Sequence, residues 1–412
     1  MARIIPFQPY RYSPAAGPLD ALVTQPYDKI TPEMRARYLS LSPYNLVRVI
    51  LGERFAADSA ATNVYTRAAA YLEDWIARGV LVKEAEPALF AYSQEFSVPD
   101  TGERLVRRGF IGLGAVEDYA NGVVHRHEQT LSGPKKDRLE LLRHTRAHAG
   151  QLFMLYEDPA GAVDRILDEA AACPPVAAVT DEYQAIHRLW KIAEPERIAA
   201  IARAMAEKKL LIADGHHRYE TALAFRNENP ALADAQRVMM TFVNMHSPEL
   251  KILATHRLVS GLARFDAQAL IGAAGLRPVG DVAALRALWA EPHAGQVRIG
   301  VALAGVDPLY VYQADRSAGE LDVPVLHQRL LGDTLGINDE AVREEKNTRY
   351  MRGLEPAIAE VRRGAAQAAF LLEPTPIEDV ARIAFSGGVM PQKSTDFYPK
   401  LLSGLTVYKL ER

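Results

Sequence analysis

The sequence predicts a mixed α+β protein, because segments with helical and with strand periodicity alternate along the chain. Residues 62–77 repeat apolar side chains at helical spacing, and Gly79 follows as a stop signal. Residues 88–98 and 105–116 have the composition of strands, and the Pro-Asp-Thr-Gly turn at 99–102 between them predicts a hairpin. The hydrophobic fraction of 49% and the charged fraction of 24% are those of an ordinary globular protein.

The other elements are expected on both sides of this hairpin. Residues 1–55 are rich in Pro and Tyr, so we expect an arm that wraps a surface rather than forming a core. The further strands expected are 151–156, 209–213, 238–245, 252–258, 297–304, 309–313 and 369–372. The further helices expected are 127–149, 194–207 and 219–227, two more after residue 265, and others after residue 313.

The length of 412 residues exceeds what one ordinary core fills, so two or three domains are expected. We expect an N-terminal arm, helix and hairpin region at 1–120 and a core that carries the site motifs at 121–260. A C-terminal α/β region should occupy 261–412, with a candidate active-site lid at 387–400.

Charge and cysteine content limit the partners of this protein. The net charge of −3 and the pI near 6.4 give no pull towards nucleic acid, so no nucleic-acid partner is expected. No apolar run is long enough to span a membrane, and the N-terminus lacks a secretory signal. The single cysteine, Cys173, excludes an intramolecular disulfide and fits a reducing compartment. We therefore expect a cytoplasmic protein, and the sequence leaves homo-oligomers open.

The most informative motif is Asp214-Gly215-His216-His217-Arg218, between an apolar strand and a helix. Gly215 permits the sharp turn, and the free amides of the helix's first turn favour an anion. Arg218 can bind phosphate oxygens in a bidentate way, and Asp214 can hold Mg²⁺ or accept a proton. His216 and His217 can donate or carry protons. These groups suit phosphoryl transfer, whereas the structural alternative is a capping aspartate, a turn glycine and incidental histidines.

A second polar cluster surrounds the segment 123–148. Its histidines suggest a metal site, and they are His125, His127, His144 and His148. Its cations suit an anionic phosphate better than a transition metal, and they are Arg126, Lys135, Lys136, Arg138, Arg143 and Arg146. Both interpretations stay open, together with a solvated helix face for the last two histidines.

A third cluster lies near the C-terminus. Lys393, Ser394, Thr395 and Lys400 follow two glycines and could close over a polyphosphate or nucleotide as a lid, although no Walker motif is present. A surface loop is the alternative. The Thr255-His256-Arg257 segment follows an apolar strand and is a candidate for the inner wall of the site.

Asp214–Leu223 resembles the signature of the DUF1015 family of uncharacterised bacterial proteins. Other segments agree with the same family, which implies membership over nearly the whole chain. These segments are Gln25-Pro26-Tyr27-Asp28, Pro43-Tyr44-Asn45, His127-Glu128-Gln129-Thr130, Asp137-Arg138-Leu139, Thr255-His256-Arg257, Met390–Thr395 and Phe397–Lys400.

A His-Glu pair followed by Asp-Gly-His-x-Arg is also similar to the ParB/sulfiredoxin fold, particularly its free-serine kinases. The resemblance implies a ParB/sulfiredoxin-like core with additional N-terminal and C-terminal α/β regions. It also implies Glu128 as the base and Asp214 as the Mg²⁺ or acid–base partner. Glu128 and Asp214 are 86 residues apart, which exceeds the spacing expected in compact kinases and predicts an insertion around 159–197. The resemblance further implies a phosphate cradle formed by Gly215, His216 and Arg218. We also expect substrate or wall contacts from His127, Arg138, His256 and Arg257.

The resulting hypothesis is a phosphotransferase that acts on a small hydroxyl metabolite. By resemblance it is a free L-serine kinase that uses Mg²⁺ with ATP, ADP or pyrophosphate as the phosphoryl donor. One alternative is a nucleotide-binding switch or NTPase of the ParB type that binds CTP or ATP. Another is a metal-dependent phosphohydrolase that uses the histidine cluster. A sulfiredoxin-like reductase is disfavoured, because Cys173 lies outside the anion-binding turn.

Overall fold

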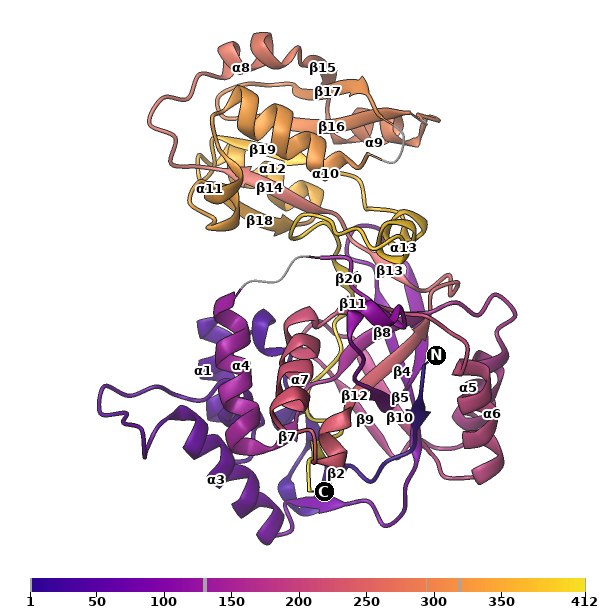
Figure 1. The fold of residues 1–412 in the computed structure, drawn as a ribbon. Coiled ribbons are helices and arrows are strands. Elements are labelled where there is room, and N and C mark those ends of the chain that lie inside the picture. Colours follow the sequence, from indigo (N-terminus) through magenta and orange to yellow (C-terminus); the bar gives the residue numbers. More distant parts are fainter. Residues whose placement is uncertain (1, 129–131, 294, 318–319, 412) are drawn as a thin grey trace.

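The computed structural model describes residues 2–128, 132–293, 295–317 and 320–411. Figure 1 shows a large unit built on one sheet and, above it, a smaller C-terminal unit, residues 255–372, built on a second sheet. The large sheet has nine strands in the order β6-β11-β8-β12-β5-β4-β10-β9, with β1 paired to β5. The smaller sheet has six strands in the order β15-β17-β16-β19-β14-β18. The mixed α/β class predicted from the sequence is confirmed.

The large sheet combines parallel and antiparallel pairs. The predicted hairpin forms, with Phe90 opposite Ile111 and Gly102 in the left-handed region at φ +70°. β11 runs parallel to β6 and antiparallel to β8. The strand bounds are β1 (Ile4–Ile5), β4 (Leu89–Ser97), β5 (Arg104–Ala115), β6 (Val124–His125), β8 (Leu152–Tyr156), β9 (Ala177–Thr180), β10 (Ile186–Ile192), β11 (Leu210–Asp214) and β12 (Arg237–Asn244).

Two apolar layers cover this sheet. One contains Val163 and Leu167 of α5, Ile201 of α6 and Tyr219 of α7. The opposite layer is filled by the C-terminal segment, which returns from the small unit and buries Phe397, Leu401, Leu402 and Leu405. Apolar burial on both faces explains why β8, β11 and β12 are nearly continuous apolar runs. The helix bounds are α4 (Ser132–Thr145), α5 (Ala162–Ala171), α6 (Pro195–Met205) and α7 (His216–Glu228).

The N-terminal segment does not behave as the expected surface arm. It contains α1 (Pro32–Leu41) and α2 (Val47–Ile50), and β1 joins the large sheet. Leu22, Leu46 and Val49 are buried against Trp75 of α3 (Val64–Ala77), so the segment forms a small core of its own. Pro14 and Pro32 lie in the first turn of a 3-10 helix and of α1, where the missing N–H costs nothing.

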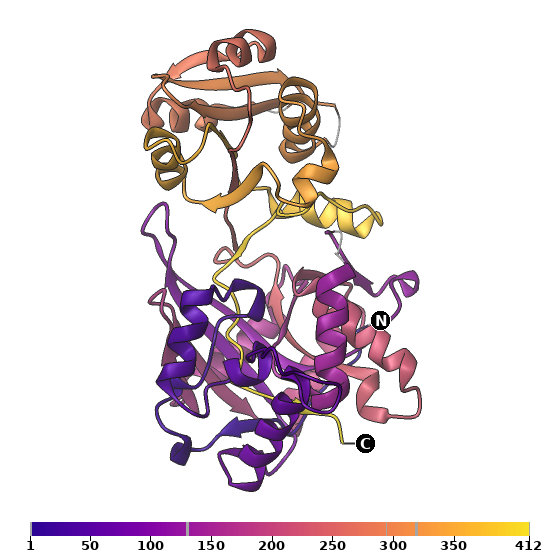
Figure 2. The same ribbon diagram turned by 90° about the vertical axis from the view of Figure 1, so that its left-hand side faces the viewer.

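The C-terminal unit packs helices on its sheet. Its strands are β14 (Thr255–Val259), β15 (Arg277–Gly280), β16 (Gln296–Leu303), β17 (Leu309–Asp315), β18 (Thr348–Arg352) and β19 (Ala368–Leu371). Its helical elements are α8 (Ala267–Ala274), α9 (Val282–Ala290), α10 (Asp322–Val325), the π-helix Leu326–Thr334, α11 (Asp339–Arg343) and α12 (Leu354–Arg362). Figure 2 shows this unit joined to the large unit through narrow connections.

The connections between the units include the short pair β13 (Lys251–Ile252) and β20 (Phe397–Tyr398). After β19 the chain forms α13 (Ile377–Phe385), which packs on the large unit through Val380 and Ala384. The division of the chain at residues 120 and 260 stays a prediction, and the large sheet draws strands from both sides of residue 120. The expected insertion at 159–197 contains β10, which pairs along its own whole length with β4. Within the described residues, no helix combines the length and apolar character needed to cross a bilayer.

Candidate functional site

The turn after β11 places the predicted motif at the end of an inner strand. β11 ends at Asp214, and α7 begins at His216. Gly215 adopts φ +95°, and a Cβ atom there would lie 3.0 Å from both Arg218 Nε and Leu152 Cδ2. Among the described residues, no side chain caps this end of α7, so its first amides stay available to a ligand.

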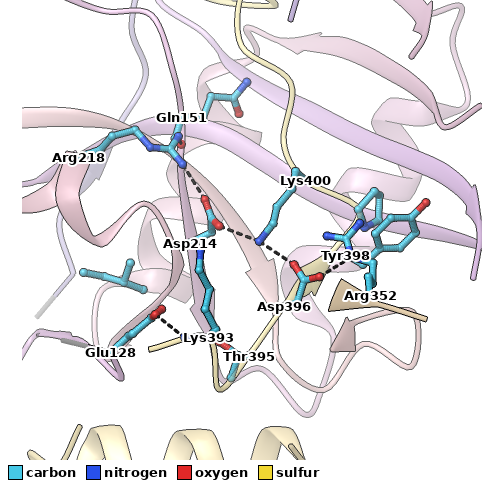
Figure 3. Close-up of polar contacts among 12 residues, drawn as sticks. Glu128, Gln151, Asp214, Arg218, Arg352, Lys393, Thr395, Asp396, Tyr398 and Lys400 are labelled. Carbon is cyan, nitrogen blue, oxygen red and sulfur yellow. Dashed lines mark hydrogen bonds and ion pairs between the residues drawn. The ribbon is translucent and has the colours of Figure 1, made fainter. Parts of the chain in front are cut away.

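Asp214 is held between two cations (Figure 3). Its Oδ1 accepts a hydrogen bond from Lys400 Nζ at 2.8 Å, and its Oδ2 accepts one from Arg218 Nη2 at 2.6 Å. Burial by itself would raise the pKa of Asp214, but the two cations outweigh burial and hold this pKa far below its usual range. Arg218 also donates to the carbonyl oxygen of Gln151, which fixes its guanidinium beside the turn.

The charges continue in an alternating chain towards the C-terminal unit. Lys400 Nζ also lies 3.3 Å from Asp396 Oδ1, and Arg352 Nε donates to Asp396 Oδ2 at 2.5 Å. Burial opposes ionisation of Asp396, but Lys400 and Arg352 lower its pKa to about 2. The chain from Arg218 through Asp214, Lys400 and Asp396 to Arg352 therefore connects α7 with β18 (Figure 3).

The segment that carries Lys400 is anchored by a buried arginine. Arg107 of β5 is 1% exposed and donates to the carbonyl oxygens of Tyr398 at 2.9 Å and Pro399 at 2.6 Å. Gln94 of β4 donates to the carbonyl oxygen of Lys400 at 2.8 Å. Burial lowers the pKa of Arg107 to about 9. The central strands thus fix the backbone from which Lys400 reaches Asp214.

Glu128 enters from the other side of the turn. Its Oε1 accepts a hydrogen bond from the backbone N–H of Lys393 at 2.9 Å, and its backbone bridges that of Met390. Burial raises the pKa of Glu128 above its ordinary value, and the Lys393 amide works in the opposite direction. Lys393 has φ +57°, so the predicted lid bends sharply here. Gln129 and Thr130 of the same motif lie outside the described residues.

Two buried histidines support the turn from behind. His127 Nδ1 lies 2.8 Å from the Ile212 carbonyl oxygen, which can only accept, so this nitrogen carries the proton. His127 Nε2 then accepts from Thr395 Oγ1 at 2.8 Å. Burial lowers the pKa of His127 to about 4 and that of His216 well below its ordinary value. His216 packs 4.7 Å from the His127 ring, and its Nε2 is buried with no partner among the described residues.

These groups surround one pocket of about 250 Å³, which we call the central pocket. Its predicted lining residues are Glu128, Asp214, Gly215, His216, His217, Arg218, Lys393, Thr395 and Lys400. Tyr27, Asp28, Lys29, Glu345 and Gln392 complete most of its wall. Burial lowers the pKa of Lys29, and the neighbouring charges of Lys400 and Lys393 lower it further. The N-terminal segment, the turn and the C-terminal segment therefore meet at one site.

The remaining predicted site residues lie elsewhere. Ser394 is buried and donates to the Pro391 carbonyl oxygen at 2.7 Å, so its hydroxyl holds the loop instead of lining the pocket. Arg138 packs 4.2 Å over the Tyr27 ring and lines a neighbouring apolar pocket. His256 is buried in the small unit, where its Nδ1 accepts from the Leu372 amide, and it is not among the residues that line the central pocket. Arg257 supports the lid indirectly by donating to the Lys393 carbonyl oxygen at 3.0 Å.

The structure does not assemble the predicted histidine cluster. His125 lies near the Ala384 and Gly122 carbonyl oxygens, and His144 Nδ1 lies 2.8 Å from the Glu140 carbonyl oxygen. His148 stacks on Tyr408. In the described part of the chain, no group of three or more His, Cys, Asp or Glu could hold a metal ion. The metal site suggested for these histidines is therefore not assembled in the described part of the chain.

Several residues of the site were not singled out from the sequence. Lys29 follows directly on the family segment Gln25–Asp28, and that neighbourhood is the signal that could have found it. Asp396 lies between the family segments Met390–Thr395 and Phe397–Lys400, which is a comparable signal. Arg107 and Arg352 carry no local signal, because each is defined by contacts with residues distant in the chain.

The fold and site define an α/β protein with a cation-rich pocket at a strand-to-helix turn. Residues 4–323 match the family described as Protein of unknown function (DUF1015), and the chain belongs to this family. The family assignment made from the motifs is confirmed, although the matched region ends before the Met390–Lys400 segments. Among the curated proteins, none matches this sequence.

Solved structures similar to this chain include a free serine kinase in complex with AMP. The two share 15% sequence identity with a TM-score of 0.37, and the match covers 69% of this chain and 89% of the kinase. C-terminally truncated SbnI from Staphylococcus aureus has 10% identity, a TM-score of 0.37 and coverage of 72% and 87%, respectively. A conserved hypothetical protein from Pyrococcus furiosus has 15% identity, a TM-score of 0.36 and coverage of 70% and 92%. These similarities are too distant to carry a function to this chain.

Proposed function

We propose that this protein is a phosphotransferase that phosphorylates a small hydroxyl metabolite in the central pocket, with L-serine as the first acceptor to test. The observation that carries the proposal is the convergence of Lys29, Arg218, Lys393 and Lys400 on the open end of α7. Cations and free helix amides are the groups that bind phosphoryl oxygens and stabilise charge in their transfer.

Asp214 keeps two of these cations in place before the donor arrives. Each carboxylate oxygen of Asp214 takes one cation, Lys400 or Arg218, so both side chains are oriented without a ligand. A phosphoryl group that enters the pocket meets cations that need little reorganisation, and this preorganisation favours the transition state. ATP, ADP and pyrophosphate all present such a group, and the pocket chemistry is common to the three.

Glu128 is the general base in this proposal. Its carboxylate lines the same pocket as the cations, and burial raises its pKa towards the range in which a carboxylate accepts a proton efficiently. The hydroxyl proton of the acceptor moves to Glu128 while the acceptor oxygen attacks the terminal phosphorus of the donor.

Mg²⁺ remains part of the proposal as a companion of the donor. Since both oxygens of Asp214 already pair with cations, a metal at Asp214 would have to displace Lys400 or Arg218. Asp28 lines the same pocket and is exposed, and Mg²⁺ bound to phosphates needs only one or two protein carboxylates. Asp28 therefore fits a donor-bound Mg²⁺ better than Asp214 does, and the ion would supply neutralisation of the phosphate charge.

The direct test is phosphoserine formation by the full chain from L-serine and Mg²⁺ with ATP, ADP or pyrophosphate. Glu128→Gln should lower the transfer rate by about 100-fold or more, which is the usual contribution of a general base. Lys400→Met should also lower the transfer rate, because it removes one of the cations of the pocket. Its control is Lys83→Met, because Lys83 also pairs with a carboxylate but lies away from the pocket. Intact transfer in both Glu128→Gln and Asp214→Asn would show that the mechanism is wrong. Nucleotide binding with no phosphorylated product would instead favour the nucleotide-binding switch.

A further inference from the structure

A second and larger cavity lies beside the central pocket, between the C-terminal unit and the returning segment 389–392. Its volume is about 690 Å³. Its walls come from the π-helix Leu326–Thr334, from α11 and from residues 389–392. The family match ends at residue 323, so this cavity is built by a part of the chain outside the matched region. We call it the acceptor cavity.

The acceptor cavity has an apolar floor and a charged rim. Ile337, Val342 and Met390 are buried at its floor. Asp333, Asp339 and Arg343 line it with exposed side chains, and they offer charges of both signs. A few polar groups on an apolar surface are typical of small-molecule sites. The two signs suit a ligand that carries both an ammonium and a carboxylate group.

His327 is a polar residue in the wall of the cavity. It lies in the π-helix, lines the cavity, and has a buried Nε2 with no hydrogen-bond partner among the described residues. A buried imidazole nitrogen without a partner costs free energy, and a ligand group within hydrogen-bonding reach would remove that cost. π-helical turns occur frequently at functional sites, because they redirect single side chains.

The acceptor cavity and the central pocket share a wall. Gln392 lines both of them, and the backbone of Met390 in the cavity floor bridges that of Glu128 in the pocket. Arg257 packs 5.2 Å over the ring of Tyr350, another lining residue of the cavity, and donates to the Lys393 carbonyl oxygen. Residues 390–392 therefore form part of the wall between the acceptor cavity and the central pocket, on the side where Glu128 lies.

We propose that the acceptor cavity binds the phosphoryl acceptor, a hydroxyl compound with both an ammonium and a carboxylate group, and presents its hydroxyl to Glu128. This inference rests on the proposed phosphotransferase function. The acceptor oxygen forms the new bond to the terminal phosphorus, the bond from that phosphorus to the donor's bridging oxygen breaks, and the hydroxyl proton passes to Glu128. The leaving group is the donor shortened by one phosphoryl unit. Because the cavity is larger than the central pocket, it has room for an acceptor larger than serine.

Acceptor binding without a donor tests the location of this site. The probes are L-serine, L-homoserine and L-serylglycine, and titration calorimetry on the full chain measures their affinities. Val389→Trp introduces a large side chain at an exposed position of the cavity wall and should weaken binding by about tenfold or more, since it builds a steric clash. Val176→Trp is the matched control at another exposed valine. We expect L-serylglycine to bind more tightly than L-serine.

A second variant tests the ligand class without changing the shape of the cavity. Arg343→Met should weaken L-serine and L-serylglycine by about tenfold but leave ethanolamine, which has no carboxylate, unchanged. The location is wrong if Val389→Trp binds all three amino-acid probes as the unaltered chain does, or if none of the probes binds. The class is wrong if ethanolamine binds as tightly as L-serine. Binding that Val389→Trp abolishes, without any phosphoryl transfer, would retain the cavity and overturn the proposed function.

Discussion

Substitution of Lys400 should have the largest effect on both the stability of the fold and the geometry of the site. Its side chain is 9% exposed, and its ammonium group pairs with two carboxylates, those of Asp214 and Asp396. Removing one partner of a buried ion pair costs about 3–5 kcal/mol, because the opposite charge stays buried without compensation. Asp214 keeps Arg218 and Asp396 keeps Arg352, so Lys400→Met should lie near the lower bound, at about 3 kcal/mol.

The assay is urea unfolding of the large unit followed by tryptophan fluorescence. The chain has three tryptophans, and Trp289→Phe leaves only Trp75 and Trp190, which both lie in the large unit. In this background we compare Lys400→Met with the unaltered lysine and with Lys83→Met. The exposed pair of Lys83 with Glu411 should contribute less than about 1 kcal/mol.

The pH dependence of the free energy of unfolding tests the same ion pairs independently. The folded-state pKa of Asp396 is about 2, below its ordinary value of 3.8, so its ionisation stabilises the fold above pH 3.8. This contribution is lost as the pH falls from 3.8 through 2. Lys400→Met should reduce it, so the stability difference from the unaltered chain should shrink as the pH falls. A Lys400→Met chain as stable as the unaltered one at pH 7 would refute the reasoning, as would a double-mutant cycle with Asp396→Asn that shows no coupling.

Three further predictions concern the site. Burial raises the pKa of Glu128, and only its ionised form accepts a proton, so kcat/KM for transfer should fall as the pH drops through that raised pKa. Glu128→Gln should abolish this acidic limb of the pH profile. An unchanged limb would mean that another group titrates. Gly215→Ala should destabilise the chain by about 1–2 kcal/mol and weaken donor binding, because a φ of +95° is strained for alanine and the added methyl group would lie 3.0 Å from Arg218 Nε and Leu152 Cδ2, which must shift. Thermal unfolding and nucleotide titration measure the two effects, and an alanine variant equal to the native chain would contradict the turn geometry. Arg107→Met should raise the donor KM more than the acceptor KM, because Arg107 holds the segment from which Lys400 reaches the proposed donor site. Equal changes in both KM values would indicate a general loss of structure instead.

Local sequence determined the elements on which the site is built. The hairpin β4–β5 and the strand-turn-helix from β11 to α7 follow from periodicity and turn chemistry that act over a few residues. Gly215 predicted a sharp turn between strand and helix, and its φ of +95° agrees with that expectation. The family motifs also identified Glu128, Arg218 and Lys393, which the structure places around one pocket.

Only the tertiary structure decided which charges meet. Lys400 and Asp214 are separated by 186 residues, and Arg107 contacts carbonyl groups 291 and 292 residues away, so no local pattern could indicate either contact. Proline and tyrosine content suggested a surface arm at residues 1–55, yet apolar side chains between the prolines pack into a core and bring Lys29 to the pocket. His256 and Arg257 are neighbours in the sequence, but strand alternation and the position of β14 in the second sheet separate their roles. Elements follow from short-range preferences, whereas ion pairs between distant segments depend on how the sheets and the returning C-terminal segment pack.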